Sequence, residues 1–442
     1  MSFPRYPEYK DSGVEWLRKV PAHWDLARFK HILRERDERS IGGEEELLSV
    51  SAYTGVTPRS AIIEAGAQLT RAETLEGYKV CKRNDLVVNI MLAWNRGLGV
   101  TVHDGIVSPS YCVFEPNSRV YPRFLDYLVR CDQYLPYFKA HSAGVIDSRL
   151  RLYPDVLAGL IAIMPPLNEQ RAIVDVLDHE TAKIDALVAE QERLIALLKE
   201  KRQAVISHAV TKGLDTDAPV LASAVEELDA IPAHWAIHRM TTISTKITNG
   251  YVGPTRDILI EDGVRYLQSL HVKSNRILFD VPYFVSRDWS DEHAKSILQA
   301  GDVLIVQTGD IGQTAVVTPE FEGCNCHALI IVSPKKEVVE GAWISWVLNS
   351  SYGKDSLAAI QTGALHPHLN CGDVKDVVIP LPPLEEQRKV MAYLEQALDR
   401  IDLLVAEAQK LVEVLSQRRS ALIAAAVTGQ IDVRGLAPAE AA

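Results

Sequence analysis

Cysteine is scarce in this chain, and long apolar runs are missing. Six cysteines in 442 residues show no framework spacing, so we do not expect a disulfide scaffold. No run of 18 apolar residues occurs, which argues against a membrane-spanning helix. The N-terminus also lacks the apolar stretch of a signal peptide. Together these features predict a reduced, cytoplasmic protein with no membrane partner.

Positive charge is also lacking. The chain has 47 Lys and Arg against 58 Asp and Glu, a net charge of −11. A protein that binds nucleic acid alone normally needs an excess of basic side chains to displace phosphate counterions. The balance therefore disfavours a solitary DNA binder, and leaves open a subunit whose partners supply positive charge. The least acidic part is the first globular segment, residues 1–163.

Catalytic signatures are absent as well. We find no phosphate loop, no glycine-rich dinucleotide fingerprint and no Asn/Asp-Pro-Pro-aromatic motif of an amino-methyltransferase. Neither a Gly-x-Ser-x-Gly elbow nor a His-Glu-x-x-His pair occurs. The sequence thus predicts a chain without catalytic residues and without a cofactor of its own.

One cluster resembles a metal site only loosely. Cys324 and Cys326 are one residue apart, with His327, His366, His368 and Cys371 nearby in the sequence. Structural zinc sites space their cysteines by two to four residues. Buried thiols and surface histidines explain the cluster better, so we predict no metal ligand here.

What the sequence does contain is a long internal repeat. Met-Pro-Pro-Leu-Asn-Glu-Gln-Arg at 164–171 returns as Leu-Pro-Pro-Leu-Glu-Glu-Gln-Arg at 381–388. Pro-Ala-His-Trp also occurs twice, at 21–24 and 232–235, and a packing role for its His and Trp is the preferred interpretation. A repeat of this length indicates two copies of a whole module, which suits a partner or substrate with two similar halves.

Each copy contains a long heptad pattern. Apolar residues recur at steps of four and three from Ile173 to Val205, and again from Val390 to Leu422. Sustained heptads predict coiled-coil helices. The Pro-Pro pair and the acidic first turn before each pattern are typical of a helix start. The matching seams predict that the two helices pack on each other, in antiparallel fashion if the two modules are related by a pseudo-two-fold axis.

The globular parts show short apolar runs between Gly, Pro and Asp, such as 85–89 and 302–306. The expected fold class is α+β, with two globular α/β domains in a pseudo-two-fold arrangement separated by the two helices. The expected segments are 1–163 and 215–380 for the domains, 164–214 and 381–435 for the helices, and 436–442 for a disordered tail. An acidic stretch, 215–229, is expected to be a linker.

Loop residues with basic, amide, hydroxyl or aromatic side chains are the candidates for DNA contact, because these groups pair with base edges and phosphates. In the first domain they are Tyr53, Thr54, Arg59, Trp94, Asn95, Arg96, Ser142, Arg149 and Arg151. In the second they are Asn249, Tyr251, Arg256, His271, Lys273, Asn275, Arg276, Gln307, Thr308, Gln361, Thr362, His366 and His368. A solvated loop or a turn is the alternative for each.

The whole pattern resembles the specificity subunits of type I restriction-modification systems. The resemblance depends most on 381–388, Ile401-Asp402 and 418–423, on their counterparts in the first copy, and on 9–17 and 301–304 with Thr308-Gly309. Trp94-Asn95-Arg96-Gly97 departs from the Thr-Gly version of that loop, and both versions are seen in the family.

This resemblance implies a function. Each domain would read one half of a bipartite double-stranded DNA site, and the helices would set the spacing and dock two methyltransferase subunits. Those partners would bind S-adenosylmethionine and methylate adenine at N6. Restriction and translocase subunits would cleave DNA with ATP and Mg²⁺.

Alternatives from other classes stay open at this point. The chain could be the specificity subunit of a methyltransferase-only complex or a scaffold with two protein-binding modules. A self-contained methyltransferase or nuclease fragment is a further alternative, for which the sequence offers no site.

Overall fold

The computed structural model describes residues 4–61, 74–223, 225, 228–363 and 367–436. The chain divides into two compact units, Met1–Gln191 with Lys410–Ala442 and Glu192–Gln409. Each unit contains one globular domain, a part of one long helix and a part of the other. The two units are described separately.

The first domain is built around a four-stranded antiparallel sheet in the order β4-β11-β8-β9. Strand β8 is buried along its whole length. Leu86 and Val88 face the main core of this unit, and Val87 faces a smaller cluster on the other side. This two-sided burial explains why the strand is an unbroken apolar run. The bounds are β4 Leu33–Glu35, β8 Leu86–Asn89, β9 Leu98–Val100 and β11 Tyr111–Pro116.

The other strands of this domain form two-stranded antiparallel sheets. They are β1 Tyr9–Asp11 with β2 Lys19–Pro21, β3 Asp25–Arg28 with β12 Ile161–Met164, β5 Leu48–Ser51 with β6 Gly55–Pro58, and β7 Lys79–Cys81 with β10 Gly105–Val107. The α-helices are α1 Pro122–Arg130, α2 Tyr134–Ala140 and α3 Pro154–Gly159. The 3-10 helices are η1 Phe29–His31, η2 Arg59–Ala61, η3 Ala93–Asn95 and η4 Asp147–Arg149.

The second domain repeats this plan with a four-stranded antiparallel sheet in the order β16-β25-β22-β23. Its bounds are β16 Ser244–Asn249, β22 Val303–Val306, β23 Thr314–Val316 and β25 Leu329–Pro334. A second sheet, β17-β21-β18-β24, has no counterpart among the described strands of the first domain. It comprises β17 Leu259–Ile260, β18 Val264–Leu267, β21 Phe284–Val285 and β24 Asn325–Cys326.

Three more strand pairs and several helices complete this unit. The pairs are β13 Val220–Ala222 with β14 Ala230–Pro232, β15 Ala236–Arg239 with β26 Val378–Leu381, and β19 Val272–Lys273 with β20 Arg276–Ile277. The α-helices are α5 Met240–Ile243, α6 Arg287–Glu292, α7 Gly341–Asn349, α8 Ser351–Ala359 and α9 Cys371–Val374. The 3-10 helices are η6 Ser269–His271, η7 Ala294–Ser296 and η8 Pro319–Phe321.

The acidic stretch 215–229 differs from the expected linker. Val220–Ala222 pairs with Ala230–Pro232, and the Lys212 ammonium donates to the Ala230 carbonyl at 2.6 Å. Residues 220–222 of this stretch are therefore one strand of a hairpin, and the second strand is hydrogen-bonded to Lys212, at the end of the first long helix. Of the expected tail, 437–442 lie outside the described residues.

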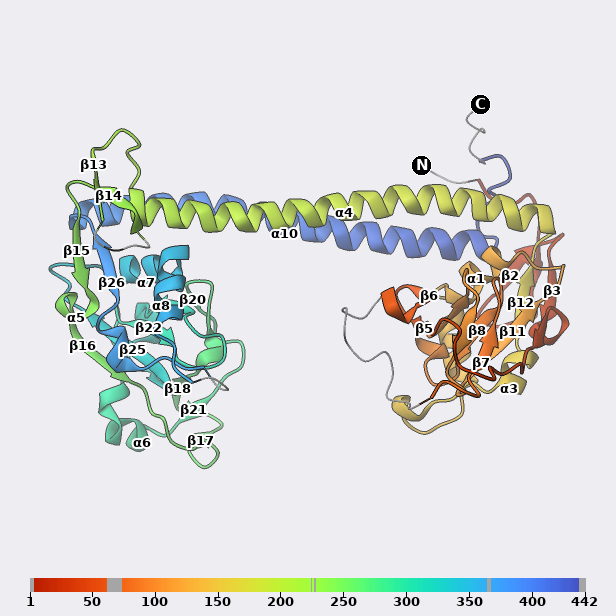
Figure 1. The fold of residues 1–442 in the computed structure, drawn as a ribbon, viewed down its shortest axis with the longest axis horizontal. Coiled ribbons are helices and arrows are strands. Elements are labelled where there is room, and N and C mark those ends of the chain that lie inside the picture. Colours follow the sequence, from red (N-terminus) through yellow and green to blue (C-terminus); the bar gives the residue numbers. More distant parts are fainter. Residues whose placement is uncertain (1–3, 62–73, 224, 226–227, 364–366, 437–442) are drawn as a thin grey trace. The chain divides into compact units, whose positions relative to one another are not determined.

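Two long helices, α4 Leu167–Lys212 and α10 Leu384–Val427, confirm the heptad prediction (Figure 1). In the first unit the Arg419 Nε lies 2.8 Å from the Asp185 carboxylate. In the second unit the Arg202 Nε lies 2.9 Å from the Asp402 carboxylate. The repeat places Asp185 and Arg202 at the positions of Asp402 and Arg419. The helices thus run antiparallel in each unit and make the same ion pair with the roles exchanged.

The two rows of the heptad seam differ in burial. Leu177 and Leu394 have no exposed surface. Leu187 and Leu404, which occupy the same repeat position, are 47% and 49% exposed. Ile184 and Ile401, three residues earlier, are only 6% exposed, so burial alternates between the two rows of the seam. No helix in the described part of the chain combines the length and apolarity that crossing a membrane requires.

Candidate nucleic-acid interface

Glu169, in the first turn of α4, attaches that helix to the first domain. It is almost fully buried and accepts hydrogen bonds from Trp24 Nε1 at 3.0 Å and His23 Nε2 at 2.8 Å. The Tyr6 hydroxyl also donates to it. Burial and the neighbouring carboxylate raise the pKa of Tyr6, so its hydroxyl keeps the proton that it donates.

Glu386 makes the same attachment in the second unit. Trp235 Nε1 donates to it at 3.0 Å, and His234 Nε2 lies 2.8 Å away. The glycine after α4, Gly213, has a positive φ, and a Cβ there would lie 3.3 Å from the Trp235 ring. The packing role predicted for both His-Trp pairs is confirmed.

The neighbouring glutamine of each motif joins the helix start to the backbone of its domain. Gln170 accepts from the Tyr121 amide at 2.7 Å, immediately before α1. Gln387 accepts from the Glu340 amide at 3.0 Å, immediately before α7. Both glutamines are fully buried. The repeated Glu-Gln pair therefore fixes the position of α1 and α7 relative to the start of the long helix in its own unit.

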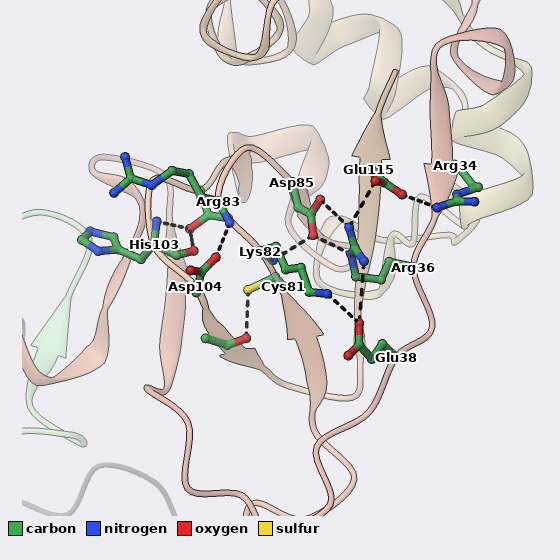
Figure 2. Close-up of polar contacts among 12 residues, drawn as sticks. Arg34, Arg36, Glu38, Cys81, Lys82, Arg83, Asp85, His103, Asp104 and Glu115 are labelled. Atoms are coloured by element: carbon green, nitrogen blue, oxygen red, sulfur yellow. Dashed lines mark hydrogen bonds and ion pairs between the residues drawn. The ribbon is translucent and has the colours of Figure 1, made fainter. Parts of the chain in front are cut away.

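Figure 2 shows that basic side chains of the first domain's sheet are largely neutralised by acidic ones. Arg36 donates to the buried Asp85 carboxylate at 2.8 Å and 3.3 Å and lies 3.6 Å from Glu115. The hydrogen bond with Asp85 raises the pKa of Arg36. Lys82 pairs with Glu38 at 3.4 Å. This cluster stabilises β4, β8 and β11 and offers little free charge for a phosphate.

Three predicted contact residues of the first domain meet at one hollow. Tyr53 and Thr54 form the tip of the β5–β6 hairpin, and Arg96 follows η3; all three line a cavity of about 500 Å³. Tyr53 is 95% exposed. Arg96 has φ +57° and pairs with Asp132, so its charge is already compensated in this structure.

A second group lies where strand β8 ends. The Leu152 amide donates to the Ile90 carbonyl, and Ala143 pairs with Arg151 in an isolated antiparallel bridge. This brings Ser142, Arg149 and Arg151 toward the end of β8. Trp94 lies in the same region, with the Lys139 ammonium 4.9 Å from its ring centroid and its indole N–H bound to the Met91 carbonyl.

The second domain repeats both groups with different residues. Leu369 donates to the Gln307 carbonyl where β22 ends, and Thr362 pairs with His368 as Ala143 does with Arg151. Asn249, at the end of β16, lies at the same edge of the sheet. The amide oxygens of Asn249 and Gln307 are buried without a hydrogen-bond partner among the described residues. Such groups normally have a donor, and the described residues do not supply one here.

The β19–β20 hairpin carries Lys273, Asn275 and Arg276. Lys273 and Arg276 are exposed, and Arg276 lies 3.5 Å from the Asp399 carboxylate of α10. His271, just before the hairpin, has no exposed surface. Its ring accepts from the Gln268 amide and donates to the Val281 carbonyl, both at 2.8 Å. This structure therefore gives His271 a role in loop structure and no surface that a base can reach.

The predicted residues differ in exposure. Those exposed are Tyr53, Thr54, Asn95, Arg149, Arg256, Lys273, Arg276, Thr308 and Thr362. Those partly buried are Arg59, Trp94, Arg96, Ser142, Arg151, Asn249, Tyr251, Asn275, Gln307, Gln361 and His368. His366 lies outside the described residues. Tyr251 packs edge-on against Trp289 and His293, with ring centroids 5.0 Å apart in both cases.

Exposed cations without an acidic partner are the strongest candidates for phosphate contact. Within the described residues, Arg149, Arg256 and Lys273 form no ion pair. No group of three or more metal-ligating side chains is found in the described part of the chain.

Sequence reasoning missed the side chains that support these loops. Arg130 on α1 binds the β5–β6 hairpin, and Asn349 on α7 binds the β19–β20 hairpin. The two helices have nine residues each, and Arg130 and Asn349 are their last residues. This equivalence depends on the helix bounds, which the sequence alone does not give.

Two copies of one domain, each attached to the start of a long helix by the same Glu-Gln pair, define a duplicated protein whose polar loops differ between the copies. Residues 243–413 match the family model described as the type I restriction modification DNA specificity domain. In sequence the chain is similar to the specificity subunits of type I restriction enzymes.

Two curated relatives illustrate the similarity. The Escherichia coli type I restriction enzyme EcoBI specificity subunit is 24% identical over 307 residues, 67% of this chain and 64% of that protein. This match therefore spans slightly less than two thirds of that relative. The MjaVIII specificity subunit of Methanocaldococcus jannaschii is 21% identical over 97% of this chain and 98% of that protein.

Solved structures show the same fold. A chain from a study of complex assembly and conformational transition of the type I R-M system has a TM-score of 0.70 at 17% identity, covering 92% of this chain and 98% of its own length. The HsdS subunit from Thermoanaerobacter tengcongensis has a TM-score of 0.52 at 19% identity, covering 93% and 98%.

Proposed function

We propose that each globular domain of this specificity subunit reads one half of a bipartite DNA site. The observation that carries this proposal is the pairing of a common scaffold with different loops. The two domains share the four-stranded sheet and the Glu-Gln attachment, yet the residues at the hairpin tips and strand ends differ. A shared scaffold with different contact groups suits two different half-sites.

The chemistry would belong to partner proteins. Two methyltransferase subunits would bind S-adenosylmethionine and methylate adenine at N6, and restriction and translocase subunits would cleave DNA with ATP and Mg²⁺. We assign α4 and α10 the roles of setting the half-site spacing and docking the methyltransferase subunits in the cytoplasm. The acidic balance of the chain is compatible with this assignment, since partners can supply much of the phosphate-binding surface.

A methylation assay on the assembled complex tests the proposal. Total DNA treated with the chain and its methyltransferase subunits is sequenced by a long-read method that detects N6-methyladenine. We expect one two-part motif with a fixed gap. The chain alone is expected to methylate and cut nothing. Methylation by the lone chain, or by the complex without sequence preference, contradicts the proposed function.

A further inference from the structure

The last turns of α1 and α7 occupy equivalent places and differ in chemistry. Both helices have nine residues, so Asp126 and Arg130 of α1 correspond to Ser345 and Asn349 of α7. In each domain these two positions face an edge strand of the main sheet and a hairpin that carries predicted DNA-contact residues.

Arg130 binds two loops at once. Its guanidinium donates to the Leu98 carbonyl, after η3, at 2.6 Å and to the Ala52 carbonyl, in the β5–β6 tip, at 3.0 Å. The full set of acceptors is the carbonyls of Ser51, Ala52, Tyr53, Arg96 and Leu98. Burial lowers the pKa of Arg130, which shows how far the group is removed from water.

Two glycines lie close to the side chains of Asp126 and Arg130. A Cβ at Gly99 would lie 3.1 Å from Asp126 Oδ1, and one at Gly55 would lie 3.5 Å from the Arg130 guanidinium. Asp126 accepts from the Val100 amide at 2.8 Å and so fixes strand β9. These contacts hold the β5–β6 tip and the loop after η3 in one arrangement.

Helix α1 is itself anchored on α4. Arg123 and the Tyr127 hydroxyl both bind the Asp178 carboxylate, at 2.9 Å and 2.6 Å. A continuous series of contacts therefore runs from α4 through α1 and Arg130 to the hairpin tip at Tyr53.

In the second domain, the side-chain amide of Asn349 likewise joins a hairpin to the edge strand of the main sheet. Its Nδ2 lies 3.0 Å from Asn275 Oδ1 and 3.1 Å from the Thr314 carbonyl on β23. Ser345 donates to the same Asn275 oxygen at 2.5 Å. Asn275 has φ +66°, a left-handed conformation within the tight turn of the hairpin. The Asn349 carbonyl accepts from Gln203 of α4 at 3.0 Å.

We propose that Arg130 and Asn349 are positioning residues that set the base preference of the two domains by fixing the recognition hairpins 51–55 and 273–276. The inference rests on the proposed function. Base readout by hydrogen bonds requires each contact group to lie within about 0.5 Å of the position that the base demands. The tip of a two-stranded hairpin does not hold its side chains that closely without support from the rest of the domain. Neither residue needs to touch DNA.

The test uses the full chain assembled with its methyltransferase subunits. The wild-type motif is first determined by long-read sequencing. Methylation rates are then measured on duplexes with the intact site and on duplexes with one base pair changed in either half. We expect Arg130→Met to reduce discrimination in one half by about tenfold, the size of one lost base-specific contact. Asn349→Ala should do the same in the other half only.

Matched variants separate positioning from general damage. Arg34→Met removes an exposed arginine of the same domain and should leave both halves unchanged. Affinity for a duplex without the site should stay within about twofold in all variants, because phosphate contacts are untouched. If Arg130→Met fails to assemble, Arg130→Lys replaces it; Ser345→Ala replaces Asn349→Ala.

Three outcomes overturn the proposal. They are full discrimination in both halves by the assembled variants, an equal loss in both halves from one variant, and a loss in the same half from both variants. A wild-type complex without site preference is a different result, because it contradicts the proposed function and not the positioning role alone.

Discussion

At the residue scale, two residues at the same position of the repeat can differ in burial and in the number of hydrogen bonds they accept. Glu169 and Glu386 lie at the same repeat position, but the first is almost fully buried with three donors and the second is 29% exposed in its side chain with two. The same motif residue is therefore expected to contribute differently to the two units.

Glu169→Ala should destabilise the first unit strongly. The change leaves the Trp24 N–H and the Tyr6 O–H buried without an acceptor, and each such group costs about 1–3 kcal/mol. We expect faster amide hydrogen exchange in residues 19–24 and a lower urea midpoint. Glu386→Ala should have a smaller effect in 230–235. Glu190→Ala, on the exposed face of α4, is the control and should change the free energy of unfolding by less than about 0.5 kcal/mol.

His271 predicts a pH dependence. Burial lowers its pKa from the usual 6.5, so the unfolded chain binds the proton more readily than the folded one. Its contribution to stability is full above pH 6.5 and is lost as the pH falls below that value. His271→Asn should cost about 1 kcal/mol at pH 8, for the lost bond to Val281. Urea unfolding at several pH values should show that the difference in free energy of unfolding between the wild type and His271→Asn shrinks below pH 6.5. A difference that stays constant with pH would contradict the lowered pKa of His271.

The sequence could indicate residue types that suit DNA contact, but it could not show which of them are exposed. Nothing in the local sequence distinguishes His271, enclosed by Gln268 and Val281, from the exposed Lys273 two residues later. That difference depends on how the loop returns to the sheet. Arg130 and Asn349 were missed for a similar reason. The hydrogen-bond partners of the Arg130 side chain lie 32 to 79 residues away in the sequence, and those of the Asn349 side chain lie up to 74 residues away.

At the element scale, periodicity predicted the long helices well. The heptads of 173–205 and 390–422 fall inside α4 and α10, and the runs at 85–89 and 302–306 contain β8 and β22. Short paired strands such as β13–β14 carry no comparable pattern, so an acidic linker was expected there. Exposure at Leu187 and Leu404 was also not predictable, because these leucines fit the heptad as well as the buried Ile184 and Ile401 do.

The reciprocal ion pairs between α4 and α10 should add little stability. Asp185 and Arg419 are about half exposed, and exposed pairs typically contribute about 0.2–1 kcal/mol. A double-mutant cycle with Asp185→Ala and Arg419→Ala, measured by urea unfolding, should give a coupling in this range that falls at high salt. The equivalent cycle at Arg202 and Asp402 should agree with it. A coupling above about 2 kcal/mol, or one that ignores salt, would show that these pairs hold the helices together.

At the scale of the whole molecule, duplication explains the arrangement of contacts. Each domain begins and ends next to a long helix: β3 pairs with β12 in the first domain and β15 with β26 in the second. The Glu-Gln attachment lies just beyond β12 and β26. The loops that differ between the two domains are therefore enclosed between equivalent ends, and we expect each domain to be exchangeable as a unit.

Replacing residues 25–160 by the matching segment of a relative should change one half of the methylated motif. The exchange begins at β3 and ends before β12, so Trp24 and Glu169 keep their hydrogen bond and α4 keeps its attachment. All predicted contact residues of the first domain are exchanged, and none of the second. Long-read sequencing should show new letters in one half, with the other half and the gap unaltered. The reciprocal exchange of 236–377 serves as the control and should change only the other half. New letters in both halves after one exchange, or in neither, would mean that the domains do not read DNA independently.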